Sequence, residues 1–326
     1  MQLPGKELLS MLNTTVWQHP QTYVELDDSL KIDLLHLTSV LVQHYSEDLL
    51  PYHKEVIKFA TQFTLHPIDL VVRQTALLLS AHFFARVRSP AKFILNTWTT
   101  LLRLGHTDGR PALRTEALNV LVPSLKDSEL PDPNRVGSGE LQEGGPPAWA
   151  KATRHLLIED GSSYTYTIFL LIVQNSNLFF PVRELFVTYI VGSLQKLGLL
   201  VNATLETKLL SIELLQIVFD WDMRAEAIRT SDTSAMEVDG STVSEEWKVP
   251  LAYRENMVSY LVRLATFPHD VQYRGRILQR TLDLLNIAVG PEGWPDVTFG
   301  TRYFMRALDQ VIVQPVVPTC TMLIFG

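Results

Sequence analysis

Cysteine is almost absent from this chain of 326 residues. The single cysteine, Cys320, allows no internal disulfide, and no second cysteine stands near a histidine at the spacing of a zinc site. We therefore expect a reducing, intracellular compartment and no metal site.

Long hydrophobic runs and an excess of positive charge are also missing. No uninterrupted apolar run reaches the ~18 residues that a membrane span needs, and the first residues show no basic segment followed by an apolar stretch. The formal net charge is −7, the wrong sign for a surface that wraps phosphate backbones. We expect a soluble chain that binds neither membrane nor nucleic acid directly.

Apolar residues are abundant, and they recur at the spacing of helices. The chain is 46% hydrophobic, and no segment shows convincing strand-like alternation. Steps of three and four residues place apolar side chains on one side of a helix in three clear stripes: Leu30, Leu34, Leu37, Leu41 and Tyr45; Leu205, Leu209, Ile212, Leu215 and Phe219; and Leu278, Leu282, Leu285 and Val289.

Prolines stand near the starts of these periodic segments, where proline costs a helix no hydrogen bond. They are Pro51, Pro67, Pro90, Pro111, Pro181, Pro250 and Pro268. Helix starts fall roughly every twenty residues, and two helices per ~40 residues is the length of a HEAT or armadillo unit. The sequence predicts an all-α fold: an α-solenoid of HEAT-like antiparallel helix pairs, with roughly twelve helices.

Composition divides the chain further. We predict HEAT-like helical repeats at 1–123, 148–229 and 250–309, a Pro/Gly-rich loop at 124–147, an acidic disordered loop at 230–249, and an apolar tail at 310–326. The tail contains Pro315 and Pro318, and no polar helix closes the stack at either end. We expect the chain to be a piece of a longer protein.

Few residues have the spacing of a chemical site. Gly137, Gly139, Gly144 and Gly145 superficially resemble a phosphate loop, but no Gly-Lys-Ser/Thr follows and no strand precedes them, so we interpret them as part of a loop. The histidines, among them His36, His44, His53 and His66, form no metal-ligand pair. We predict no catalytic, cofactor-binding or metal-binding residue.

Two short motifs have both a structural and a recognition interpretation. At the end of the second stripe, Trp221 is predicted to seal the core while Asp220, Asp222 and Arg224 face water, although an aromatic ring flanked by carboxylates also suits recognition. Phe180-Pro181-Val182-Arg183 is interpreted as a helix entry. The acidic loop, with Met236 and Val238, is predicted to be a solvated insertion; phosphorylation or binding of a basic partner is the alternative.

The run from Phe179 to Arg229 carries Pro-Val-Arg, then Gln-Lys-Leu-Gly, then a helix ending in Trp-Asp-Met-Arg. In this order the motifs resemble the TRRAP family (transformation/transcription domain-associated proteins). The segments SLKIDLLHLTSVLVQHYSEDL, RTEALNVLVP, MVSYLVRLA and GRILQRTLDLLNIAVGPEGWP resemble successive helices of the same region. The resemblance covers roughly residues 27–308 and implies a fragment of the family's HEAT-repeat ring.

That resemblance implies a nuclear, catalytically inert relative of the phosphatidylinositol 3-kinase-related kinases. The family acts as the activator-binding scaffold of SAGA-type and nucleosome-acetyltransferase-type histone acetyltransferase complexes, so the implied partners are transcription activators and complex subunits. Its kinase-like domain lies at the far C-terminal end of the full protein, and this chain has no kinase glycine-rich loop, HRD or DFG motif. We expect no enzyme activity, no cofactor and no small-molecule substrate.

Two alternatives stay open at this point. The first is a karyopherin-like HEAT transport receptor, which would also be acidic. The second is a fragment of an active phosphatidylinositol 3-kinase-related kinase.

Overall fold

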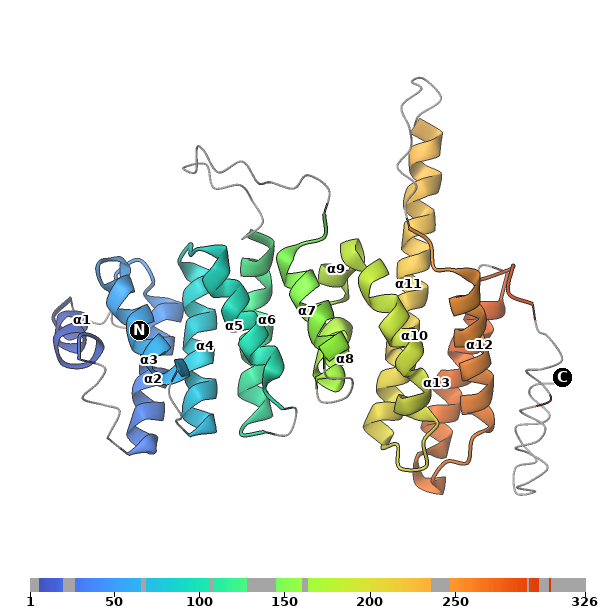
Figure 1. Ribbon diagram of the computed structural model, residues 1–326, viewed down its shortest axis with the longest axis horizontal. Coiled ribbons are helices and arrows are strands. Elements are labelled where there is room, and N and C mark those ends of the chain that lie inside the picture. Colours follow the sequence, from blue (N-terminus) through green and yellow to red (C-terminus); the bar gives the residue numbers. More distant parts are fainter. Residues whose placement is uncertain are drawn as a thin grey trace. The chain divides into compact units, whose positions relative to one another are not determined.

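The computed structural model describes residues 6–19, 27–65, 69–105, 108–127, 145–159, 164–235, 247–291, 293–298 and 305. Within these ranges every regular element is helical, with thirteen α-helices and short π and 3₁₀ segments (Figure 1). The chain divides into two compact units, residues 1–171 and 172–326. The predicted all-α fold of HEAT-like helices is confirmed.

Unit 1 is a row of packed helices with α4 at its centre. Helix α4 packs against α2, α3, α5 and α6, and α5 packs also against α7 (Figure 1). Neighbouring helices thus bury one another's apolar faces, as stacked helix pairs must. The elements are α1 (Lys6–Leu12), η1 (Asn13–Trp17), α2 (Asp28–His44), η3 (Leu50–Tyr52), α3 (His53–Leu65), α4 (Leu70–Arg86), α5 (Ala91–Arg103), α6 (Pro111–Asp127), α7 (Ala148–Glu159) and most of α8 (Thr165–Gln174).

Helix starts in unit 1 follow local signals in the sequence. Helix α6 begins at Pro111, and Pro90 is the residue that caps α5, as the proline pattern predicts. Asp69 caps α4: its Oδ1 accepts the backbone N–H groups of Val71 at 2.8 Å and Val72 at 3.3 Å. Both bonds satisfy donors that the first helical turn leaves unpaired.

Buried tryptophans connect the helices of unit 1. The indole Nε1 of Trp17 donates to Thr38 Oγ1 at 3.1 Å, and that of Trp98 donates to Thr153 Oγ1 at 2.9 Å. Both rings are fully buried, so each N–H needs such a partner. The two bonds hold η1 on α2 and α5 on α7.

The buried face of helix α2 matches the predicted stripe only in part: Leu41 is buried, as predicted. Leu30 and Leu37 of the predicted stripe are 44% and 45% exposed, whereas Leu35 and Thr38 are buried. The cause lies in the tertiary packing of α2 against α4. The hydrogen bond that Trp17 of η1 donates to Thr38 lies on the side of α2 that carries Leu35. That side of the helix therefore faces the core.

The described part of unit 2 contains four long helices. Helix α10 packs against α11 and α12, and α13 packs against α11 and α12 as well. The elements are the end of α8, α9 (Ser176–Phe179), the 3₁₀ turn η4 (Phe180–Val182), α10 (Glu184–Gly198), α11 (Leu205–Ala235), α12 (Leu251–Thr266) and α13 (Val271–Val289).

Of the two apolar stripes predicted for unit 2, one is buried in part as predicted and the other is only half-buried. In α11, Ile212, Leu215 and Phe219 are buried as predicted. In α13 the predicted stripe is only half-buried, because the helix packs against two neighbours and turns an adjacent line of residues inward. The buried residues each stand one position earlier: Ile277, Thr281, Leu284 and Ala288.

The first predicted loop boundary falls inside a helix. Helix α6 continues through Pro123 to Asp127, beyond the predicted end of the first repeat block at residue 123. Ser124 Oγ donates to the carbonyl oxygen of Phe84 on α4 at 3.0 Å, and Leu125 is buried. These contacts with α4 stabilise one more helical turn. The rest of the predicted Pro/Gly-rich loop up to residue 144 lies outside the described residues.

The predicted acidic loop at 230–249 is also shorter than expected at both ends. Helix α11 runs on to Ala235, and residues 247–249 lie against that helix. Near the helix end Glu226 pairs with Arg229 on the same face and with Lys248 at 3.4 Å, which holds the returning chain beside α11. Residues 236–246 and the predicted tail at 310–326 lie outside the described residues.

None of the described helices is by itself long and apolar enough to cross a bilayer. One bent combination, residues 165–174 with 176–182, meets the requirement on length and composition alone.

Candidate functional site

Arg183 forms the centre of a buried cluster in unit 2. It follows η4 directly, and its guanidinium donates to the carbonyl oxygens of Phe180 and Trp247, both at 3.0 Å. The guanidinium carbon also lies 4.5 Å from the centre of the Phe180 ring and 5.9 Å from that of Trp247. A planar cation that both donates and stacks in this way joins two segments firmly. Arg183 thus connects the start of α10 to residue 247.

Asp222 forms the second half of this attachment, and its position corrects the sequence prediction. The side chain was expected to face water, but only 2% of the residue is exposed. One carboxylate oxygen accepts the backbone N–H of Val249 at 3.0 Å, and the other accepts the indole N–H of Trp294 at 2.8 Å. A buried carboxylate is tolerated here because two donors satisfy it.

The neighbours of Asp222 behave as the sequence predicts. Trp221 is 3% exposed and donates from Nε1 to the carbonyl oxygen of Ser176 at 3.2 Å, which confirms its interpretation as a core residue. Asp220 and Arg224 are exposed. A ring that is covered in this way offers no surface to a partner.

Together these contacts hold the segment that follows the acidic insertion. Arg183 binds Trp247 beside the start of α10, and Asp222 binds Val249 beside α11. Helix α11 also leads into the insertion, so the chain enters and leaves the insertion at the same helix. Beyond the predicted helix entry and core packing, the Pro-Val-Arg and Trp-Asp-Met-Arg motifs therefore also hold residues 247–249, which the sequence did not reveal because these bonding partners are distant in the chain.

The remaining residues considered for chemistry are partly outside the described residues. His44 is exposed, His36 and His53 are half-buried, and His66 is outside the described residues, as are Cys320 and the glycines before Gly145. In the part of the chain that the structure describes, no group of three or more His, Cys, Asp and Glu side chains is placed to hold a metal ion.

Unit 1 contains a groove that sequence reasoning did not find. It lies between α3, α4 and α5 and has a volume of about 610 Å³. Leu77, Phe83 and Phe84 of α4 line its floor. Its lining also includes three cations, one near each of the three helices: Lys58, Arg73 and Arg88. No short motif encodes this site, because its residues come from separate helices.

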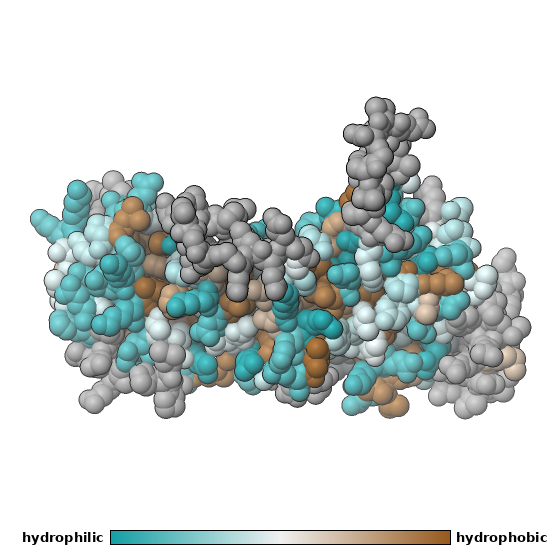
Figure 2. All heavy atoms as spheres, turned by 45° about the horizontal axis from the view of Figure 1, so that its top comes forward, coloured by the Kyte–Doolittle hydropathy of each residue, from teal (hydrophilic) through white to brown (hydrophobic). Residues whose placement is uncertain are grey.

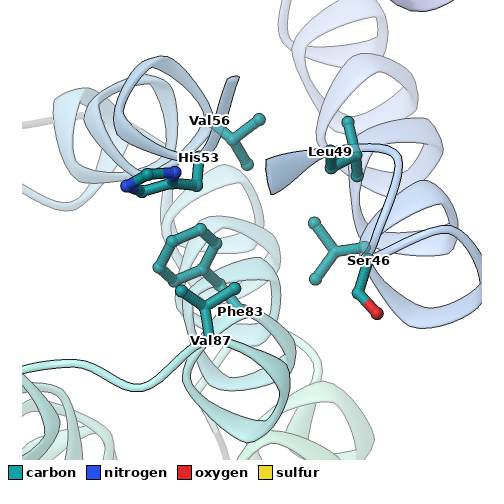
Figure 3. A pocket seen from close by; sticks show the side chains of 7 residues that line it. Ser46, Leu49, His53, Val56, Phe83 and Val87 are labelled. Carbon is teal, nitrogen blue, oxygen red and sulfur yellow. The ribbon is translucent and has the colours of Figure 1, made fainter. Parts of the chain in front are cut away.

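A small cavity adjoins the groove. Figure 3 shows His53 and Phe83 next to each other, with Leu49 and Ser46 across the cavity from them. Its volume of about 10 Å³ matches a single water molecule. His53 and Phe83 line the groove as well, so they separate the two spaces.

The face of the molecule shown in Figure 2 is mostly hydrophilic, and its hydrophobic side chains gather in separate patches. Packed helices of this kind define a helical-repeat protein.

Comparison with known proteins specifies the family. The model of the Tra1 HEAT repeat ring region matches residues 2–324, and the chain belongs to this family. The resemblance noted in the sequence is thereby confirmed. No solved structure matches the chain.

Several curated proteins are similar to the chain over part of their length. The SAGA complex/NuA4 acetyltransferase complex subunit TRA1 of Saccharomyces cerevisiae is 21% identical over 92% of the chain and 8% of its own length. The probable transcription-associated protein 1 of Dictyostelium discoideum is 32% identical over 60% of the chain and 4% of its own length. The human transformation/transcription domain-associated protein is 21% identical over 91% of the chain and 9% of its own length. The chain therefore spans less than a tenth of each of these relatives.

Proposed function

We propose that this chain is a non-catalytic scaffold segment of a histone acetyltransferase complex of the SAGA or nucleosome-acetyltransferase type. It acts in the nucleus, in transcription regulation, and offers surface to transcription activators and complex subunits. The match to the Tra1 ring region over residues 2–324 carries the proposal. The Saccharomyces cerevisiae relative, a protein named as a SAGA complex/NuA4 acetyltransferase complex subunit, supports it.

The chemistry of unit 2 supports binding rather than catalysis. Arg183 and Asp222 are the most deeply buried charges of the family-like motifs, and both are bonded to backbone or indole groups of the same unit. They stabilise the helix packing. A stacked helical segment works through the area and shape that it presents.

Purification from the source cells tests this function. A tagged form of the chain is expressed there and recovered from nuclear extract, and the co-purifying proteins are identified by mass spectrometry. We expect acetyltransferase complex subunits and histone acetyltransferase activity in the eluate. The Asp222→Ala chain is the control: it lacks the acceptor for Val249 and Trp294, so specific partners should be depleted.

Two other outcomes would contradict the proposal. Recovery of Ran and import cargo in place of acetyltransferase subunits would indicate a karyopherin-like receptor. Protein kinase activity that depends on the same polypeptide would indicate a piece of an active phosphatidylinositol 3-kinase-related kinase.

A further inference from the structure

The groove of unit 1 concentrates positive charge in a chain that is acidic overall. Lys58 and Arg88 are exposed, Arg73 is half-buried, and none of the three forms an ion pair with a described residue. The buried Nε–H of Arg73 has no hydrogen-bond partner among the described residues. No Asp or Glu is among the described residues that line the groove. The fixed charges of this lining are therefore all positive.

The groove also has an apolar character that plain surface charge lacks. Its floor is formed by Leu77, Phe83 and Phe84, and Phe93 stands at its rim with 51% of the residue exposed. The Lys92 ammonium lies 5.1 Å from the centre of the Phe93 ring, so one face of this ring is partly covered by a cation. Volumes of ~300–1,000 Å³ accept a bulky apolar group with flanking polar contacts, and 610 Å³ lies in this range.

We propose that this groove binds a short amphipathic helix of a partner protein, one that carries Asp and Glu residues beside a stripe of large apolar side chains. The apolar side chains contact the floor at Phe83 and Phe84 and the exposed ring of Phe93. The carboxylates pair with Lys58, Arg73 and Arg88. Such pairing is charge-complementary and gives the site its preference for an acidic over a basic helix.

Nucleic acid fits this groove less well. Three cations neutralise few phosphates, and the net charge of −7 repels a polyanion that extends beyond the groove. An acidic helix brings fewer charges and also covers the apolar floor, which a phosphate backbone would leave exposed.

This inference deepens the proposed function, because it gives the chemistry of one partner of the scaffold and the place where it docks. Binding of a peptide to the groove is nevertheless measured with purified chain alone, so it succeeds or fails independently of which complex the chain belongs to.

The test uses fluorescence anisotropy with a labelled helical peptide that has Leu and Phe at positions i, i+3, i+4 and i+7 and Glu or Ala elsewhere. Three comparison probes are the same peptide with Lys for Glu, the same peptide with Ser for Leu and Phe, and labelled oligo(dT). We expect the Glu peptide to bind, more weakly as salt is added, and the other three probes to bind at least roughly tenfold more weakly.

The variant Lys58→Glu/Arg88→Glu reverses two exposed groove charges and should weaken binding of the Glu peptide roughly tenfold or more. The matched control, Lys54→Glu/Lys126→Glu, makes the same change in net charge at exposed residues outside the groove and should bind normally. Phe93→Ser removes an exposed ring, so it should weaken binding without lowering the melting temperature.

Several results would overturn the inference. These are an equal loss of binding in the control pair, no loss in the groove pair or in Phe93→Ser, no preference for the Glu over the Lys peptide, and tighter binding of oligo(dT). If nuclear extract yields acetyltransferase subunits while the peptide fails to bind, the scaffold function stands and the groove proposal is wrong. If the peptide binds while no such subunits are recovered, the groove proposal stands and the scaffold function is wrong.

Discussion

Two glycines of α10 provide a matched test of the packing in unit 2. Gly198, the last residue of the helix, is buried, and a Cβ added there would clash with the hydroxyl oxygen of Tyr260. That hydroxyl is itself buried and pairs with Ser211 Oγ at 2.6 Å. Gly192 lies in the same helix but is exposed, and an added Cβ meets nothing within 4 Å. The two Gly→Ala substitutions should therefore change the free energy of unfolding in opposite directions.

The expected magnitudes follow from these contacts. In Gly198→Ala the ring of Tyr260 must move, which costs about 1–3 kcal/mol for overpacking and ~1–3 kcal/mol if the buried hydroxyl loses its partner. The better helix propensity of alanine offsets ~0.5–1 kcal/mol of this. We expect a net loss of about 1–5 kcal/mol in the free energy of unfolding for Gly198→Ala, and a gain of ~0.5–1 kcal/mol for Gly192→Ala.

Urea unfolding followed by circular dichroism measures both variants. The double variant Gly198→Ala/Tyr260→Phe removes the clashing oxygen and should recover part of the loss, with a coupling energy of ~0.5–3 kcal/mol in a double-mutant cycle. Rescue should be incomplete, because the ring carbon that bears the hydroxyl is 2.9 Å from the added Cβ. A Gly198→Ala chain as stable as the parent would refute the packing described for α10 and α12.

Two further predictions concern buried polar groups. Asp222→Ala leaves the N–H groups of Val249 and Trp294 without their acceptor, and should lower the free energy of unfolding by ~2–4 kcal/mol in urea titrations, while an unchanged value would contradict the buried cluster. Burial lowers the pKa of His82 and of His269, so the unfolded chain takes up protons that the folded chain refuses. The free energy of unfolding should therefore be highest above a pH of about 6.5 and should fall as the pH drops below it. Melting temperatures measured from pH 8 to pH 5 check this. In the His269→Gln variant the melting temperature should depend less on pH.

Much of the local structure could be predicted from the sequence. Pro90 and Pro111 mark the starts of α5 and α6, and the stripe through Leu215 and Phe219 identifies the buried side of α11. Such signals act over one or two helical turns, where steric limits on proline and the helical period decide the outcome.

The buried face of a helix was predicted less well when two neighbours compete for it. In α2 the exposed Leu30 and Leu37 were assigned to the core, and in α13 the buried residues lie one position earlier than predicted. Both helices carry apolar residues on more than one side, so periodicity leaves several faces open. Packing then selects the face that has partners.

The sequence by itself determined that the chain is helical, where most helices begin, and which family it resembles, because these depend on residues close together in the chain. Only the tertiary structure decided that Asp222 is a core residue, since its partner Trp294 lies 72 residues further on. The same holds for the groove, where Lys58, Arg73 and Arg88 meet around the floor of α4. A contact between distant residues depends on how helices pack, and helix packing is a property of all the apolar faces together.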